Sequence, residues 1–319
     1  MQLNAITRKS ALSAILLLIV VLIAATFRYC FNPYELELAD CEFRERVVSL
    51  VVAMFIFFCG GVICGKMLPR SGLSVGYCTL PIPLYGILAC GVLVAPDILA
   101  TATASFCFAL SLYLLLRSLH RAGEKDSVFF AALLLGATVP LEPSCIVLVG
   151  VLPIAILALA LSLRQAFLLI LGYLLPIFGA SYVLWYRGGE LLDFPRNVLS
   201  HLATSRMNLE SMTDFHHLSV AMIALVAILF VWGLVYSIVR PGKMFLLSRI
   251  RRSLHLFVWV LVLTLSMFLI PACDISACAI IAVPATILLS FVLSLLPENH
   301  STLAYWVLLL LFVVHLFLA

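Results

Sequence analysis

Residues 162–186 read SLRQAFLLILGYLLPIFGASYVLWY, and an arginine, Arg187, follows at once. No charged side chain occurs between Arg164 and Arg187, and most of the intervening residues are apolar. About 20 such residues are enough to carry an α-helix across the hydrocarbon core of a bilayer. The strands of a membrane β-barrel would instead alternate in polarity over roughly ten residues. The stretch therefore predicts a transmembrane helix.

The composition extends this prediction to the whole chain. Of its 319 residues, 65% are hydrophobic and only 11% are charged, whereas about 25% of the residues of a soluble domain are charged. Because lipid offers the backbone no hydrogen bonds, apolar segments of this length must be helical. We predict an all-α, polytopic transmembrane helical bundle that forms a single integral membrane domain over residues 1–319. About eleven spans are expected, at residues 11–27, 48–65, 73–94, 98–116, 127–141, 144–163, 165–186, 218–239, 254–271, 277–296 and 303–319.

Lysine and arginine gather on the cytoplasmic side of a membrane protein, so their distribution predicts its orientation. With the N-terminus in the cytoplasm, thirteen of the 19 cations fall in inner segments and six in outer ones. The 15 acidic residues divide the other way, with three inside and twelve outside. We expect residues 11–27 to be a retained signal anchor, with cleavage near Ala24–Ala25 as the alternative. The predicted location is the bacterial inner membrane, with the N-terminus in the cytoplasm.

The ten cysteines show neither metal-binding nor redox spacing. No C-x-x-C motif occurs and no His/Cys cluster has the spacing of a zinc site, so we predict no metal site. Cys30–Cys41 and Cys273–Cys278 lie in outer segments, where disulfides and free thiols are both open. No basic patch is interleaved with exposed aromatic residues, and we expect no nucleic-acid partner. The sequence identifies no cofactor.

Two outer loops, residues 28–46 and 187–217, contain enough polar side chains to build a site. The first carries five carboxylates, among them Asp40 and Glu42, and a carboxylate beside a bilayer can act as a general base on an acceptor hydroxyl. The second carries arginines, which can bind a lipid phosphate in a bidentate manner. Two solvated connecting loops without a site are the alternative interpretation.

The second loop also contains an amphipathic stretch over residues 191–203. Its apolar side chains suit a short helix that lies on the bilayer surface. We expect its leucines and Phe194 to face the membrane; the apolar set is Leu191, Leu192, Phe194, Val198, Leu199 and Leu202.

The sequence PLEP at residues 140–143 interrupts two apolar stretches. A helix from Val128 to Pro140 would extend about 20 Å, which is short of a hydrocarbon core of about 30 Å. Two prolines then prevent a regular helix from continuing. Glu142 therefore lies either in water at a loop tip or at membrane depth, where an ionisable side chain marks a candidate site. Both placements are open.

The order of features between residues 96 and 197 resembles the middle of membrane glycosyltransferases of the GT-C class, including the protein-mannosyltransferase and aminoarabinose-transferase kinds. These features are an acidic residue that opens a span, helices that end in arginine, a glycine-containing short helix before a charged break, and a leucine-proline step before a long outer loop. They fall at Asp97, Arg117, Gly136, Pro143, Arg164, Pro176 and the loop from Arg187. Residues 162–186 also resemble an uncharacterised bacterial family of small polytopic membrane proteins.

The resemblance implies roles for particular residues. Enzymes of this class use an aspartate of the first outer loop to activate the acceptor, and a polyprenyl-phosphate-linked sugar is the donor. Asp40 or Glu42 is the nearest equivalent of that aspartate. Members of the class often carry a phosphate-binding lysine in the charged break, where this chain has Glu142. Arg187 and Arg196 are then the remaining candidate cations for the lipid phosphate.

Three functions from different classes remain. The first is a lipid-carrier-dependent glycosyltransferase, or a protein that handles a lipid-linked sugar, in cell-envelope glycan assembly. The second is a non-catalytic membrane scaffold or subunit. The third is a transporter, which would be expected to show inverted repeats and mid-span charges. The sequence shows no convincing repeat between its halves and almost no mid-span charge, which disfavours the third.

Overall fold

The computed structural model describes residues 11–31, 43–73, 79–90, 98–120, 125–159, 161–203, 224, 226–228, 231, 248–269, 277–296 and 298–318. In these ranges every element of regular structure is a helix, which confirms the predicted all-α class. The order is α2 (Ala11–Phe31), α4 (Phe43–Ser71), α5 (Pro81–Cys90), α6 (Ile98–His120), α7 (Lys125–Leu141), the 3₁₀-helix η1 (Pro143–Gly150), α8 (Val151–Leu159), α9 (Leu163–Tyr186), α10 (Asp193–Ala203), α13 (Ser248–Leu265), the 3₁₀-helix η3 (Ser266–Leu269), α14 (Ala277–Leu295) and α15 (Glu298–Leu318).

Ten of the predicted spans overlap these helices, whereas most of the span predicted at 218–239 lies outside the described residues. Four described helices are long and apolar enough to cross a membrane, and several shorter apolar helices accompany them. The four are Val47–Ser71, Ile98–Ser118, Leu163–Tyr186 and Ala277–Leu295. Length and composition therefore indicate a membrane protein, and the number of about eleven spans stays a prediction.

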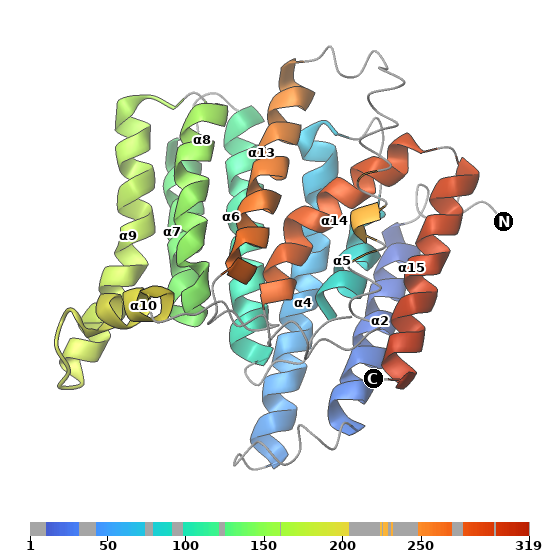
Figure 1. The fold of residues 1–319 in the computed structure, drawn as a ribbon, viewed down its shortest axis with the longest axis horizontal. Helices are drawn as coiled ribbons and strands as arrows, with labels where there is room; N and C mark the ends of the chain where they lie inside the picture. The colour runs from blue at the N-terminus through green and yellow to red at the C-terminus, as the bar shows by residue number, and fades with distance from the viewer. Residues whose placement is uncertain are drawn as a thin grey trace.

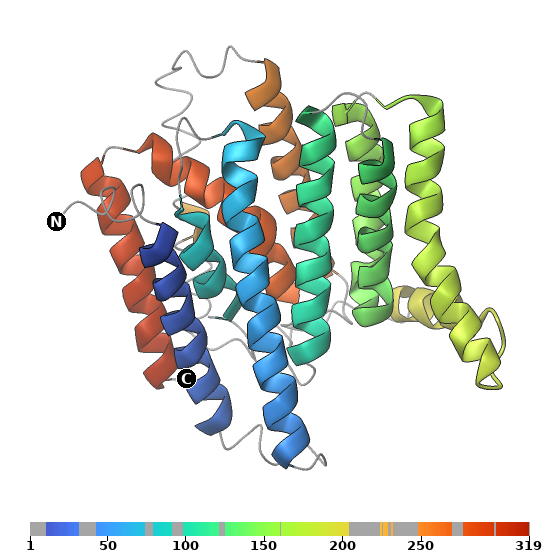
Figure 2. The same ribbon diagram turned by 180° about the vertical axis from the view of Figure 1, so that it is seen from behind.

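Most of the long helices run up and down the same axis in alternating directions, as Figures 1 and 2 show. We name the two ends of this bundle. At the basic end, α4 and α6 end and α7, α9 and α13 begin; these helices carry Lys66, Arg70, Arg117, Arg164 and Arg252 there. At the α10 end, α7 and α9 end, η1 begins, and α10 lies crosswise against the bundle (Figure 1).

Two short helices join to form one element of membrane-crossing length. η1 passes directly into α8 at Val151, and Pro143 occupies its first turn, where proline is tolerated. A 3₁₀-helix rises about 2.0 Å per residue and an α-helix about 1.5 Å. Residues 143–159 therefore extend about 30 Å, close to the thickness of a hydrocarbon core.

Small residues allow neighbouring helices to approach closely, as is common in membrane proteins. On α4, Gly61 and Gly65 face Ile82 of α5; a Cβ added to Gly65 would lie 2.5 Å from a side-chain carbon of Ile82. On α7, Gly136 lies against the backbone carbonyl of Tyr173 of α9. Reciprocally, a Cβ added to Gly172 of α9 would lie 2.7 Å from the carbonyl oxygen of Phe129 in α7. These contacts leave little room between α4 and α5 and between α7 and α9.

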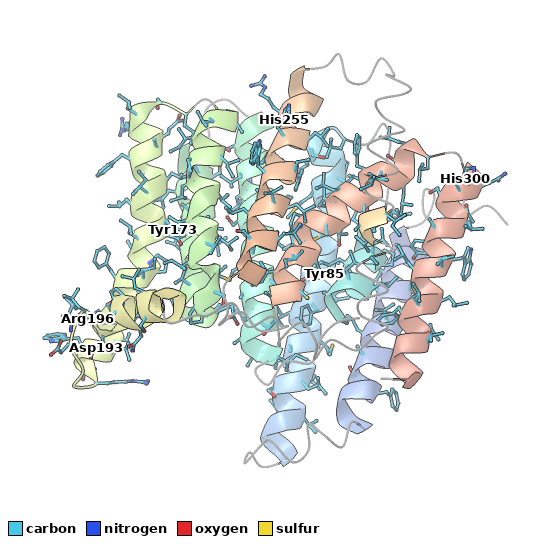
Figure 3. All side chains as sticks on the ribbon, in the orientation of Figure 1. Tyr85, Tyr173, Asp193, Arg196, His255 and His300 are labelled. Carbon is cyan, nitrogen blue, oxygen red and sulfur yellow. The ribbon has the colours of Figure 1, made fainter. Side chains whose placement is uncertain are left out.

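α14 occupies the interior and is the most buried of the four long apolar helices. It packs against α5, α6 and α13, and α5 itself is almost wholly buried (Figure 1). The Tyr85 hydroxyl of α5 lies 2.8 Å from Ser105 Oγ of α6, and Ser105 donates a 2.7 Å hydrogen bond to the Ala279 carbonyl of α14. Two hydrogen bonds, one between side chains and one from a side chain to a backbone carbonyl, thus connect three helices in the middle of the apolar bundle. Figure 3 labels Tyr85 on α5.

Candidate functional site

The charged break predicted at residues 140–143 is a tight corner between α7 and η1. The backbone N–H of Glu142 donates to the Thr138 carbonyl over 2.9 Å and closes the last turn of α7. Glu142 itself is extended, with φ −141° and ψ 101°, and its carbonyl accepts from the Cys145 N–H over 2.9 Å. The corner therefore satisfies its own backbone groups. It holds Glu142, which is half-buried, at the α10 end of the bundle.

The turn between α9 and α10 changes the chain direction through a glycine, so that α10 lies crosswise to the bundle (Figure 1). Gly188 has a φ of +97°, a backbone conformation that residues with a Cβ rarely adopt. The carboxylate Oδ2 of Asp193 then accepts a 2.6 Å hydrogen bond from the Glu190 N–H. Asp193 is the first residue of α10, where a negative charge is favoured by the exposed N–H groups of a helix N-terminus. The glycine and this hydrogen bond together set the direction in which α10 leaves α9.

Arg196, one of the predicted phosphate-binding cations, is already engaged with a carboxylate. Its Nη1 donates to Glu190 Oε2 over 3.0 Å, and the two side chains are 66% and 72% exposed. Exposed pairs of this kind contribute about 0–1 kcal/mol, so the pair can open to admit a ligand. Figure 3 shows Asp193 and Arg196 together at the α9–α10 turn, on its outer side. The sequence prediction named Arg196 as a site residue but missed its partner Glu190.

The helix predicted at residues 191–203 is confirmed as α10, which begins at Asp193. Phe194 is half-buried and packs against the hydrophobic core of the bundle, and its predicted orientation towards the membrane stays a prediction. Val198, 4% exposed, is buried beside it, and α10 contacts α9 and η1. Three leucines, Leu191, Leu192 and Leu199, stay exposed. α10 therefore packs Phe194 and Val198 against the bundle and leaves Leu199 uncovered, while Leu191 and Leu192 are exposed in the turn just before it.

Aromatic side chains mark the level at which α10 lies. Tyr182, Trp185 and Tyr186 are exposed near the end of α9, and the rings of Tyr182 and Trp185 lie 5.6 Å apart. Tyrosine and tryptophan are enriched where membrane and water meet. α10 crosses the bundle beside this part of α9 (Figure 1). The exposed leucines of α10 and of the turn before it are thus near the level expected for a membrane surface.

The structure brings some of the predicted site residues to one end of the molecule. Glu142, Arg187 and Arg196 all lie at the α10 end, and α10 packs against η1, the helix that follows Glu142. Asp40 and Glu42 lie outside the described residues, so their position relative to this group stays a prediction. Among the described residues, no group of three or more His, Cys, Asp and Glu side chains is arranged to hold a metal ion. Cys41 and Cys273, one from each pair of cysteines for which disulfides and free thiols are both open, also lie outside the described part.

Comparison with protein-family models, curated proteins and solved structures gives no match for this chain.

Proposed function

We propose that the protein is a multi-pass protein of a bacterial inner membrane, with about eleven spans and a cytoplasmic N-terminus. The support is the charge distribution, since the basic end carries the cations that resist translocation. On this proposal the α10 end faces the outside. The four long apolar helices and the exposed aromatic residues of α9 are consistent with that placement.

The orientation can be tested with two cysteine probes that flank α9. Gly189 and Ser162 are both exposed, and they lie at the α10 end and the basic end, respectively. In intact cells, a membrane-impermeant thiol reagent is expected to label Gly189→Cys and to leave Ser162→Cys at the level of the unsubstituted protein. Labelling of both variants after the membrane is permeabilised is the control. The reverse pattern in intact cells would overturn the orientation.

For the function itself, we propose that the α10 end handles or transfers a lipid-linked sugar, in a GT-C-like arrangement. The observation that carries this proposal is the placement of α10 across the bundle end, where it packs on the element that follows Glu142. A substrate with a polyprenyl tail and a polar head must be held at the boundary between lipid and water. A helix and a preceding turn that expose leucines beside half-buried and exposed charges are suited to both parts of such a molecule.

The residues have distinct roles on this proposal. Asp40 or Glu42 acts as the general base that accepts the proton of the acceptor hydroxyl. Arg187 and Arg196 bind the lipid phosphate, and Arg196 leaves Glu190 to do so. Glu142 would repel a phosphate, so we assign it to the sugar or the acceptor, whose hydroxyls can donate to a carboxylate.

A non-catalytic scaffold or subunit is the second candidate, and one observation favours it. The break that would hold a phosphate-binding lysine in the resembling class holds Glu142 here, and Arg196 is paired with Glu190. Both features reduce the positive charge available for a phosphate. A scaffold would use the same surface for a protein partner and would need no general base.

Photo-crosslinking distinguishes these two candidates. A photoreactive amino acid at Leu199, exposed on α10, is expected to form an adduct with a radiolabelled polyprenyl-phosphate sugar in membranes. The matched control is the same group at Leu163, which is also exposed but begins α9 at the basic end. Excess unlabelled lipid-linked sugar should suppress the adduct at 199. Equal labelling at both positions, or none at Leu199, would contradict the proposed function.

A further inference from the structure

α14 carries two buried hydroxyl groups that have no hydrogen-bond partner. Thr286 and Ser290 are fully buried, and neither side-chain oxygen has a hydrogen-bond partner among the residues that the structure describes. Several other hydroxyls in these apolar helices behave differently, because they donate to a carbonyl three residues earlier in the same helix. Examples are Ser71 to Leu68, Thr138 to Leu135, Thr264 to Leu261 and Ser294 to Phe291. The hydroxyls of Thr286 and Ser290 are not satisfied by their own helix.

Helix periodicity shows which way the two residues face. Residues four apart lie on the same face of a helix, and so do residues seven apart. Thr286 and Ser290 therefore share a face with Ala279, whose carbonyl accepts the hydrogen bond from Ser105. Ser105 is in turn bonded to Tyr85 of α5. The two hydroxyls thus continue a line of polar groups along the side of α14 that faces the α5–α6 region.

A third unpartnered hydroxyl comes from α15. Tyr305 is 2% exposed, and its hydroxyl also lacks a partner within the described part of the chain. Its side chain belongs to a small apolar cluster with Leu84 of α5 and with Leu289 and Leu293 of α14. Leu289 and Leu293 adjoin Ser290 on the helix surface. Tyr305 therefore belongs to the cluster of α5, α14 and α15 side chains that lies next to Ser290 along α14.

Pro284 adds a backbone acceptor to the same stretch of α14. Proline has no N–H, so the carbonyl of Ile280, four residues earlier, loses its usual helical donor. Polar groups that stay unpaired inside a protein are rare, and buried water with two to four polar partners commonly satisfies them. Hydroxyls of different helices can share such a water.

We propose that Thr286, Ser290 and Tyr305 form an internal hydration site, which binds ordered water between α5, α14 and α15. The water accepts from and donates to these hydroxyls, which an apolar environment would otherwise leave unsatisfied. This site lies in the interior of the bundle, apart from the charged groups of the α10 end. It stands whether or not the protein handles a lipid-linked sugar.

Radiolytic footprinting of the unaltered protein in detergent tests the site directly. Hydroxyl radicals form from bound water and modify adjacent side chains, which mass spectrometry then quantifies. Tyr305 is expected to be modified several-fold more than Tyr85, which is equally buried but bonded to Ser105. Equal modification of the two tyrosines would show a dry site and overturn the proposal.

Substitution gives a second test, in which the sign of the change in Tm decides whether water is bound. Thr286→Val keeps the side-chain shape and removes the hydroxyl. If water is bound, the variant lowers Tm, and the effect of Ser290→Ala is smaller in its presence than alone, because both hydroxyls share the water. Thr138→Val is the matched control, since Thr138 bonds only to its own helix. An unchanged or raised Tm for Thr286→Val would refute the site, because removing a dry, unpaired hydroxyl is favourable. Should the variant fail to fold, the radiolytic modification of Tyr305 relative to Tyr85 in the unaltered protein still tests the site.

Discussion

Replacing Gly136 by alanine is expected to destabilise the bundle severely. Gly136 of α7 lies against the carbonyl group of Tyr173 in α9, and an added Cβ would overlap that carbonyl. The obstacle is backbone and not a flexible side chain, so the two helices must move apart. Overpacking in a core costs about 1–3 kcal/mol, and we expect the upper end of that range or more here. The measurement is Tm of the purified protein in detergent.

The control for this prediction lies on the partner helix. Gly179 of α9 has open space where a Cβ would be added. Alanine favours the helical conformation over glycine by about 1 kcal/mol, so Gly179→Ala is expected to leave Tm unchanged or raise it. Gly172→Ala should resemble Gly136→Ala, because the added Cβ would meet the Phe129 carbonyl oxygen at 2.7 Å. If all three variants behaved alike, the close packing of α7 on α9 would be disproved.

Alanine substitution of Asp40 and Glu42 is expected to have the largest effect on activity. If one of these carboxylates is the general base of sugar transfer, its removal lowers the rate about a hundred- to ten-thousand-fold. Both are replaced, singly and together, because the resemblance to GT-C enzymes does not choose between them. The measurement is the envelope glycan that depends on the intact gene, with the membrane abundance of each variant determined in parallel.

Glu190→Ala is the matched control for this experiment. It removes a carboxylate from the same predicted side of the membrane, and it breaks only an exposed pair with Arg196. A small effect on activity is expected, or a gain if the freed arginine binds phosphate more readily. Full complementation by Asp40→Ala and Glu42→Ala would exclude the enzymatic hypothesis and leave the scaffold.

The positions of the helices were largely predictable from hydrophobic runs. α9 matches its predicted range within about two residues, because a chain in lipid must bond its own backbone and has little alternative to a helix. The break at Glu142 was also predictable, since prolines stand on both sides of it. Of the span predicted at 73–94, however, the helix observed is the ten-residue α5, Pro81–Cys90. Hydrophobicity alone did not show that this short helix is buried in the centre of the bundle.

The candidate site was predictable only in part. Arg196 and the amphipathic character of residues 191–203 could be seen in the sequence. The pairing of Arg196 with Glu190 and the packing of Phe194 on the bundle could not. Both depend on the direction in which α10 leaves α9. That direction follows from the backbone of Gly188 and from the hydrogen bond that Asp193 accepts, neither of which has a distinctive sequence pattern.

By itself, the sequence determined that this chain is helical, apolar and suited to a membrane, because composition and the length of apolar runs decide those properties. Only the tertiary structure decided which of several residues of the same type contact a neighbouring helix. Gly136 and Gly179 both lie in apolar helices, yet one touches a neighbouring backbone and the other faces open space. Likewise, Thr138 bonds to its own helix, whereas Thr286 has no partner among the described residues. The difference arises because a second helix approaches one position and not the other. Contacts between residues that are distant in the chain determine where that helix lies.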